Sequence, residues 1–344
     1  GHGCLDLATF TDAEMPGLGA EAWHALREAA SPLPRSIDAW RASLASCSVV
    51  WRVDEPDGQQ PLVLDGDRLY LRRYWRDETR IAASLRHRLA HTLALDPAAV
   101  RVWLDRLFSS QQEGPDWQKF ACAVASRGHF SVITGGPGTG KTYTVARLLA
   151  LLFALSPEPE RLRVALAAPT GKAAARLKAS IDEAWAQLSP LLAECPALAG
   201  WGERLGVACT LHSLLGTQRG TRAFRHNAGN PLEVDVLIVD EASMVHLGMM
   251  ADLLEALPDG ARLILLGDKD QLASVEAGAV LGELCRDAEF GRYCAQSAEF
   301  ARKACAIEIP DQYLGDGDAL AQQTVMLRRS RRFSRFQPLR APFP

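Results

Sequence analysis

The stretch "FSVITGGPGTGKTYTVARLL", residues 130 to 149, most narrowly limits what this chain can fold into. An apolar run rich in β-branched residues leads into a glycine-rich segment, and a helical pattern of apolar residues follows. The segment fits G-x-x-x-x-G-K-[ST], with Gly135, Gly140, Lys141 and Thr142 at the fixed positions. A strand before it and a helix after it are the context in which this pattern forms a phosphate-binding loop.

The residue types of this segment explain the chemistry that we expect of it. Glycines let backbone N–H groups curl around phosphates, and the start of a helix adds its positive end. Lys141 reaches the β and γ oxygens of ATP, and Thr142 offers a hydroxyl to Mg²⁺. The residues expected to hold the nucleotide in this loop are Gly135, Gly136, Gly138, Thr139, Gly140, Lys141 and Thr142.

Apolar runs alternate with helical patterns from about residue 116 onward. The runs "FSVIT", "RVALAA", "VDVLIVD" and "RLILLG" are each followed by a polar turn or a helix. Short runs of this kind, spaced by helices, predict an α/β fold with a parallel sheet covered on both faces. The N-terminal third differs, because it holds six of the eight Trp, a hairpin pattern around Asp65-Gly66 and a helical pattern over residues 76–95.

The overall composition limits the class of protein. The 344 residues carry a net charge of −3 with 48% hydrophobic residues, so the chain is globular without a general basic bias. The sequence contains no secretory signal and no apolar run of about 20 residues, so we expect no membrane partner and a cytoplasmic location. The eight Cys form no CxxC pair, and we expect them to be buried small residues in a reducing compartment.

The segment "VLIVDEAS" places an acidic pair after a buried strand. Ligands bind at the carboxyl ends of strands in open α/β sheets, so Asp240 and Glu241 are expected beside the phosphates. Asp240 can hold Mg²⁺, and Glu241 can orient and deprotonate the attacking water.

The segment "LILLGDKDQLASVEAG" carries a glutamine to the end of another strand. The amide of Gln271 can donate to the γ-phosphate or to the attacking water, and it has no charge that competes for Mg²⁺. A residue in this position is suited to report whether ATP or ADP is bound.

Taken together, the motifs resemble those of superfamily 1 helicases and, more narrowly, of RecD, the alpha subunit of RecBCD (exonuclease V) complexes. The resemblance rests on "WQKFACAVA", "GGPGTGKT", "APTGKAAARL", "TLHSLLG", "DEASM" and "GDKDQLASVEAGAVLGEL". It implies a RecA-like P-loop NTPase sheet over residues 113–300, after a small mixed α/β partner-docking domain over 1–112. Residues 301–344 would form a linker, the start of the fourth helicase motif and a basic tail.

The resemblance also implies roles for single residues. Gln118 matches the glutamine that reads adenine. Thr170 and Lys172 match a segment that touches the backbone of single-stranded DNA, and Thr210 and His212 match a second DNA-side segment. A helix glutamine, a strand-to-helix turn and a structural histidine are the ordinary alternatives for these positions.

The C-terminal stretch "VMLRRSRRF" resembles the start of the family's fourth motif, with Arg332 at the position of a catalytic arginine. Arg331 stands where an aromatic residue is expected, and the pattern then stops. From this break we expect a truncated or frame-shifted product that lacks the second motor domain.

The resemblance implies an ATP-dependent 5′–3′ DNA helicase subunit that uses ATP and Mg²⁺ in double-strand break repair and recombination. Its partners would be single-stranded DNA and RecB-like and RecC-like subunits. The alternative is a catalytically weak ATP-binding and partner-docking remnant of that helicase. An RNA-directed helicase of the same superfamily is a weaker third reading, because both nucleic acids are gripped through phosphates.

Overall fold

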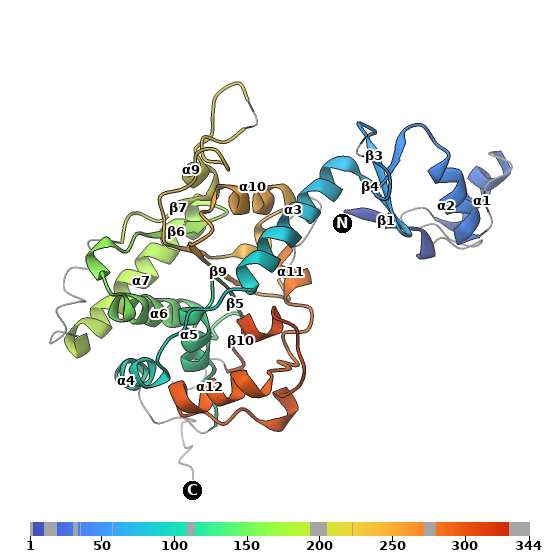
Figure 1. The fold of residues 1–344 in the computed structure, drawn as a ribbon. Helices are drawn as coiled ribbons and strands as arrows, with labels where there is room; N and C mark the ends of the chain where they lie inside the picture. Colours follow the sequence, from blue (N-terminus) through green and yellow to red (C-terminus); the bar gives the residue numbers. More distant parts are fainter. Residues whose placement is uncertain are drawn as a thin grey trace, which may run out of the picture. The chain divides into compact units, whose positions relative to one another are not determined.

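The computed structural model describes residues 3–9, 19–29, 34, 36–56, 58–108, 114–192, 205–221, 223–271 and 280–329. The described residues form two compact units, one up to Ala82 and the other from Ala83 onward. Figure 1 labels the helices and strands of both units.

The first unit is built on a small mixed sheet. Its strands are β1 (Cys4–Asp6), β2 (Val50–Arg52), β3 (Leu62–Asp65) and β4 (Arg68–Leu71), in the order β1-β4-β3-β2. The helices are η1 (Leu7–Thr9), α1 (Ala20–Ala29) and α2 (Ile37–Ala45). The predicted hairpin is confirmed, because β3 and β4 pair antiparallel around Gly66, whose φ is +59°. Leu7, Val50 and Leu64 form one small core, and Trp51, Val63 and Tyr70 form another.

The helix expected over residues 76–95 has different bounds. It begins directly after β4, and α3 spans Arg72–Leu89. The expected helix start at residue 76 was wrong, because residues 72–75, which follow β4, are already helical. The far end is also shorter than predicted, because Thr92 leaves the helix to form a bridge with Gly128.

The second unit contains the predicted parallel sheet. Within the described residues it has six strands in the order β10-β5-β9-β8-β6-β7, and every neighbouring pair is parallel. The strands are β5 (Phe130–Thr134), β6 (Val164–Ala168), β7 (Cys209–Thr210), β8 (Val236–Val239), β9 (Arg262–Gly267) and β10 (Thr324–Met326). The four predicted strands are confirmed, whereas β7 and β10 were missed because each is only two or three residues long.

Helices cover the sheet on two faces. In Figure 1, α4 to α7 and α12 gather on one side and α10 lies on the other. Alternate strand residues such as Ile133, Ile238 and Ile264 join the core under α4 to α7 and α12, while Leu237 and Leu265 between them are equally buried. The helices are α4 (Pro97–Leu107), α5 (Trp117–Arg127), α6 (Lys141–Leu155), η2 (Pro159–Arg161), α7 (Gly171–Leu192), α9 (Leu211–Leu215), η4 (Ala242–Met244), α10 (Leu247–Ala256), α11 (Val280–Leu284), α12 (Ala295–Cys305), η5 (Asp311–Tyr313) and η6 (Ala321–Gln323).

The domain boundary and the exposure of one cysteine differ from the expectation. The expected domain boundary at residue 112 lies beyond the division at Ala82, because Val100 and Leu104 of α4 pack in the core of the second unit. The cysteines in the described part of the chain are free thiols, but Cys47 is exposed, which corrects the expectation that all are buried. None of the helices in the described ranges has the length and apolar character that crossing a membrane requires.

A buried arginine fixes the end of α3 to the second unit. Arg88 is 2% exposed and donates to the backbone carbonyls of Leu257, Pro258, Asp259 and Ala261. These carbonyls follow α10 and precede β9, where a chain reversal leaves acceptors without helix or sheet partners. Burial lowers the pKa of the Arg88 guanidinium below its ordinary value, but the carbonyl oxygens compensate part of the cost of the buried charge.

We expect Arg88→Met to lower the free energy of unfolding by about 3 kcal/mol or more, because buried carbonyls lose their donors. Chemical denaturation followed by circular dichroism measures this. Arg86→Met is the matched control on the exposed face of the same helix. Equal effects of the two substitutions would contradict an anchoring role for Arg88.

Candidate nucleotide-binding site

The glycine-rich loop lies between β5 and α6, as the sequence predicts. Gly138 and Gly140 have φ of +81° and +88°, a region that favours glycine. No side chain caps α6 at Gly140, so the first N–H groups of that helix are not used by a cap. The Nζ of Lys141 donates to the carbonyl oxygens of Gly135 at 2.5 Å and Gly136 at 3.3 Å, which holds the ammonium group over the loop.

Gln118 is tied directly to this loop. Asp116 caps α5 and accepts from the backbone N–H of Gln118 and Lys119. The side-chain Nε2 of Gln118 donates to the carbonyl oxygen of Thr139 at 2.7 Å. Its Oε1 is buried and accepts no hydrogen bond from the described residues. A buried acceptor without a donor beside a phosphate loop fits the amino group of an adenine base.

The acidic pair follows β8 at the same edge of the sheet. The backbone N–H of Asp240 donates to Ala167 of β6 at 2.9 Å, and that of Glu241 donates to the Asp240 carboxylate at 2.9 Å. Glu241 has a φ of +50°, which is unusual for a residue with a side chain. Such a conformation costs about 1–3 kcal/mol and is found mostly at functional sites.

The carboxylate of Asp240 lies in a desolvated and mixed electrostatic environment. Burial is the main cause that raises its pKa, and the Glu241 charge adds to it, whereas the charges of Lys141 and Arg176 act in the opposite direction. A divalent cation would favour the ionised form of such a group, so the Asp240 carboxylate is chemically suited to Mg²⁺; Thr142 as a second ligand stays a prediction.

Gln271 follows β9, which lies between β5 and β8. Its Oε1 accepts from the hydroxyl of Ser243 at 2.9 Å, and Ser243 comes two residues after Glu241. The backbone N–H of Lys269 donates to Thr134 Oγ1 at the end of β5 at 3.2 Å. Ser243 and Lys269 were not predicted; a polar residue two positions after the acidic pair was the signal available for Ser243.

The four predicted DNA-side residues lie at the carboxyl ends of β6 and β7, two adjacent strands. Thr170 accepts from the N–H of Ala173 at 3.2 Å, and Thr210 accepts from Ser213 at 3.1 Å, so both hydroxyls cap helices. Lys172 is exposed, and the exposed His212 packs its ring edge on Phe224. The structure therefore brings these residues to one edge, and their contact with DNA remains a prediction.

The predicted arginine of the fourth motif, Arg332, lies outside the described residues. The described part of that motif is β10 and the residues after it. Leu327 follows β10 and lies against the loop, because a Cβ added to Gly135 would meet its Cβ at 3.0 Å.

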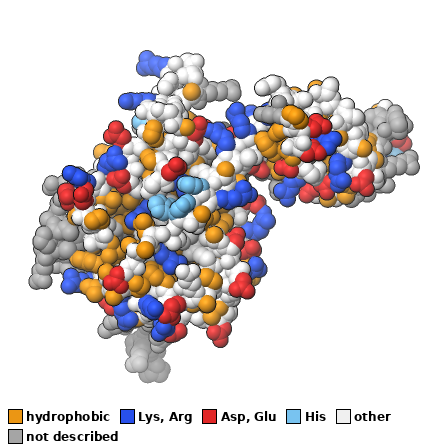
Figure 2. Space-filling model, in the orientation of Figure 1, with side chains coloured by type: hydrophobic (Ala, Val, Ile, Leu, Met, Phe, Trp, Pro, Cys, Tyr) orange, Lys and Arg blue, Asp and Glu red, His pale blue; other side chains and the backbone are white. Residues whose placement is uncertain are grey.

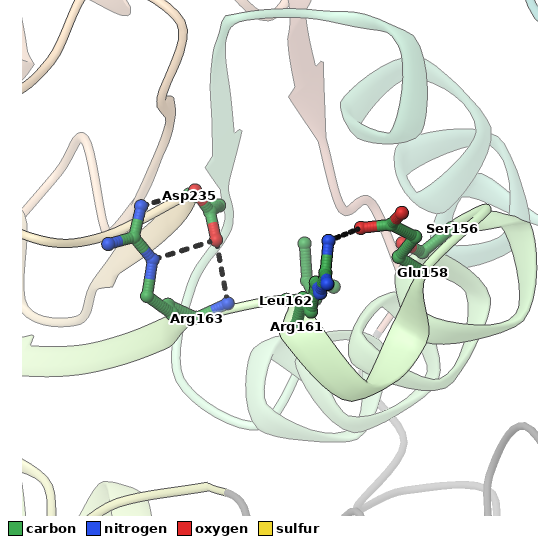
Figure 3. A pocket seen from close by; sticks show the side chains of 6 residues that line it. All are labelled: Ser156, Glu158, Arg161, Leu162, Arg163 and Asp235. Carbon is green, nitrogen blue, oxygen red and sulfur yellow. Dashed lines mark hydrogen bonds and ion pairs between the residues drawn. The ribbon is translucent and has the colours of Figure 1, made fainter.

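Hollows at the opposite, amino-terminal edge of the sheet do not belong to this site. One, of about 480 Å³, is lined by residues that precede β6 and β8, and its charges are paired: Arg163 with Asp235 at 2.9 Å and Arg161 with Glu158 at 3.0 Å (Figure 3). The other is lined by Arg88, Asp259, Gly260 and the histidines at 87, 91 and 129. Figure 2 shows histidine side chains gathered on one face of the molecule. Nothing in either hollow resembles a phosphate cradle.

We expect Asp240→Asn to raise the free energy of unfolding at pH 7 while weakening Mg²⁺-dependent ATP binding. Burial raises the pKa of Asp240 above its ordinary 3.8, so the ionised carboxylate costs stability above the folded-state pKa. The gain should therefore shrink as the pH falls from that pKa toward 3.8 and vanish below 3.8, where the carboxyl is protonated in both states. Denaturation of both proteins at several pH values measures this.

Asp235→Asn, at the other end of β8, is the control of opposite sign. Its hydrogen bond to Arg163 lowers the pKa of Asp235, so this substitution should reduce stability at pH 7. Loss of stability in both variants would show that the Asp240 carboxylate is not a destabilising group.

Two family profiles match the chain. Residues 118–277 match a profile described as an AAA domain, and residues 1–70 match the N-terminal domain of the RecBCD enzyme subunit RecD. The first match contains the loop, the acidic pair and Gln271, and the second covers most of the first unit.

Several curated proteins named as RecD subunits are also similar to this chain. The RecBCD enzyme subunit RecD of Haemophilus influenzae is 44% identical over 253 residues, which is 73% of this chain and 39% of that protein. The subunit of Mycolicibacterium smegmatis is 48% identical over 290 residues, 83% of this chain and 46% of that protein. An ATP-dependent RecD2 DNA helicase of Deinococcus radiodurans is 37% identical over 64% of this chain and 26% of its own length.

A solved structure of Pif1 helicase from Candida albicans is 21% identical and covers 58% of this chain and 50% of its own, but at a TM-score of 0.31 the likeness carries no argument. The family assignment rests on the sequence identities to the curated relatives and on the match to the N-terminal profile. The chain therefore belongs to the RecD family, and it spans less than half the length of the curated RecD subunits that it matches.

Proposed function

We propose that this chain binds and hydrolyses Mg-ATP as the first motor domain of a 5′–3′ DNA helicase subunit in a RecBCD-like complex for double-strand break repair. The observation that carries the proposal is the convergence of three loops at one sheet edge. The phosphate loop, the Asp240-Glu241 pair and Gln271 follow β5, β8 and β9, which are adjacent parallel strands. The names of the curated relatives support the helicase part of the proposal.

Each group has a role that its position supports. The N–H groups at the start of α6 bind phosphate oxygens, and Lys141 supplies positive charge to the β and γ positions. Mg²⁺, when bound through Thr142 and Asp240, would neutralise charge between the β- and γ-phosphates. Glu241 orients and deprotonates the attacking water, and Gln118 selects adenine.

The partner and DNA contacts rest on family membership and on placement in the fold. Thr170, Lys172, Thr210 and His212 lie beyond β8 from the phosphate loop, where a single strand would run past the nucleotide. The first unit would dock on a RecB-like or RecC-like subunit in the cytoplasm. Arginine from a second motor domain, or Arg332, would complete the hydrolytic site.

We expect Lys141→Ala to reduce ATP turnover about 100-fold or more, because it removes a charge that stabilises the transition state. Turnover is measured with and without single-stranded DNA, and the thermal unfolding temperature should change little. Lys303→Ala, an exposed ion-pair partner of Glu299 on α12, is the control and should keep full turnover. Equal turnover in wild type and Lys141→Ala would refute the assignment of the loop.

We expect Gln118→Ala to reduce the preference for ATP over GTP about tenfold, because the buried amide no longer distinguishes the two bases. Competition binding with the two nucleotides measures this preference. Gln296→Ala is the matched control, since Gln296 lies in the first turn of α12. A preference that survives in Gln118→Ala would assign base recognition to other residues.

A further inference from the structure

We infer that Ser243 is a positioning residue that sets the orientation of the Gln271 amide, and through it the response of the site to a γ-phosphate. The inference rests on the proposed function, because Gln271 matters only if the site binds ATP. It adds a residue that the motif analysis assigned no role.

The geometry joins two loops by one partly buried hydrogen bond, because Ser243 is buried and Gln271 is exposed. The Ser243 hydroxyl donates to Gln271 Oε1 at 2.9 Å, and Ser243 is only 6% exposed. Ser243 lies in η4, directly after the Asp240-Glu241 pair, and Gln271 lies in the loop after β9. The bond therefore links the side chain expected to sense the γ-phosphate to the segment expected to hold Mg²⁺ and water.

The direction of this bond decides what the glutamine can do. A glutamine amide has an acceptor end, Oε1, and a donor end, Nε2, on the same carbon. When Ser243 holds Oε1, Nε2 is directed away from the serine and can donate to an anion. The flipped amide would turn Oε1 toward phosphate oxygens, which repel it. With the Ser243 hydroxyl as the donor, the amide is held in the orientation that suits phosphate.

The backbone of the Gln271 loop is held separately from its side chain. The N–H of Gln271 donates to the carbonyl of Asp268 at 3.3 Å, and that of Asp270 donates to the Asp268 carboxylate at 3.1 Å. Lys269 is fixed to Thr134 of β5. With the loop held by these bonds, removal of the serine hydroxyl should release the amide without moving the loop.

Ser243 is itself held by close packing. A Cβ added to Gly267, the last residue of β9, would collide with the side chain of Leu281 in α11 and would also lie 3.3 Å from the backbone nitrogen of Ser243. The absence of a side chain at Gly267 thus lets the end of β9 approach η4. This close approach brings the serine within reach of Gln271, four residues further along the chain.

The test is a ratio of affinities, which does not require turnover. The dissociation constants of Mg-ADP and of Mg-AMPPNP, which keeps a γ-phosphate, are measured by calorimetry on the full chain. We expect Ser243→Ala to lower the ratio of the first constant to the second about tenfold, the equivalent of one ordinary hydrogen bond. Ser243→Thr, which keeps the hydroxyl, should restore the ratio.

A double-mutant cycle separates positioning from a general structural effect. If Ser243 acts through Gln271, the double variant should show the same ratio as Gln271→Ala alone. Ser131→Ala is the matched control, because Ser131 is also buried and donates to the Oε1 of another glutamine, Gln323, at 3.3 Å. It should leave the ratio unchanged.

The outcomes distinguish this inference from the proposed function. A chain that binds neither nucleotide overturns both. A chain that binds both, but whose ratio is one or is unaffected by Ser243→Ala, overturns the role of Ser243 and leaves the proposed function standing. Additive effects of Ser243→Ala and Gln271→Ala would also overturn it, because Ser243 would then act without Gln271.

Discussion

The parallel pairing of β5, β9 and β8 is the constraint on which the whole candidate site depends. Parallel strands end at the same edge, so the segments after them meet there although they are far apart in sequence. The pairing places Thr134 beside Gly267 and Val239 beside Leu265. The segments after the three strands therefore begin at nearly the same level along the strand direction. Apolar residues buried on both faces of these strands fix this register, because a slip of one residue would exchange their two faces.

The aspartates at the two ends of β8 lie in different electrostatic environments. At the amino end of β8, Asp235 is partly exposed and paired with Arg163, so its pKa is lowered. At the carboxyl end, Asp240 is also partly exposed, but desolvation of its carboxylate raises its pKa. The ion pair of Asp235 stabilises the folded state. The desolvated charge of Asp240 destabilises it, and a bound cation would offset this destabilisation. The backbone conformation of Glu241 adds strain at the same point.

The parts of the fold that could be predicted are those with a strong local pattern. The strands of four to six residues and the phosphate loop carry periodicity or fixed spacing, and the structure has them where the sequence predicts. The edge strands β7 and β10 could not be predicted, because two or three residues carry no usable alternation and depend on pairing with Ala167 or Val132. The helix α10, which follows the acidic pair, begins only at Leu247, because the left-handed residue Glu241 and η4 come first, and no sequence pattern marks that delay.

The site was predictable in its residue types but not in its contacts. Spacing identified Lys141, Asp240 and Gln271, yet no pattern shows that Gln118 reaches the carbonyl of Thr139 or that Ser243 reaches Gln271, since both bonds join distant segments.

The close packing at Gly267 limits how the segments after β8 and β9 can move relative to one another. Because the end of β9 lies against η4 and Leu281 at that glycine, the described segments that follow β8 and β9 have little room to slide past one another. A displacement of either segment at the phosphates would therefore press on the other.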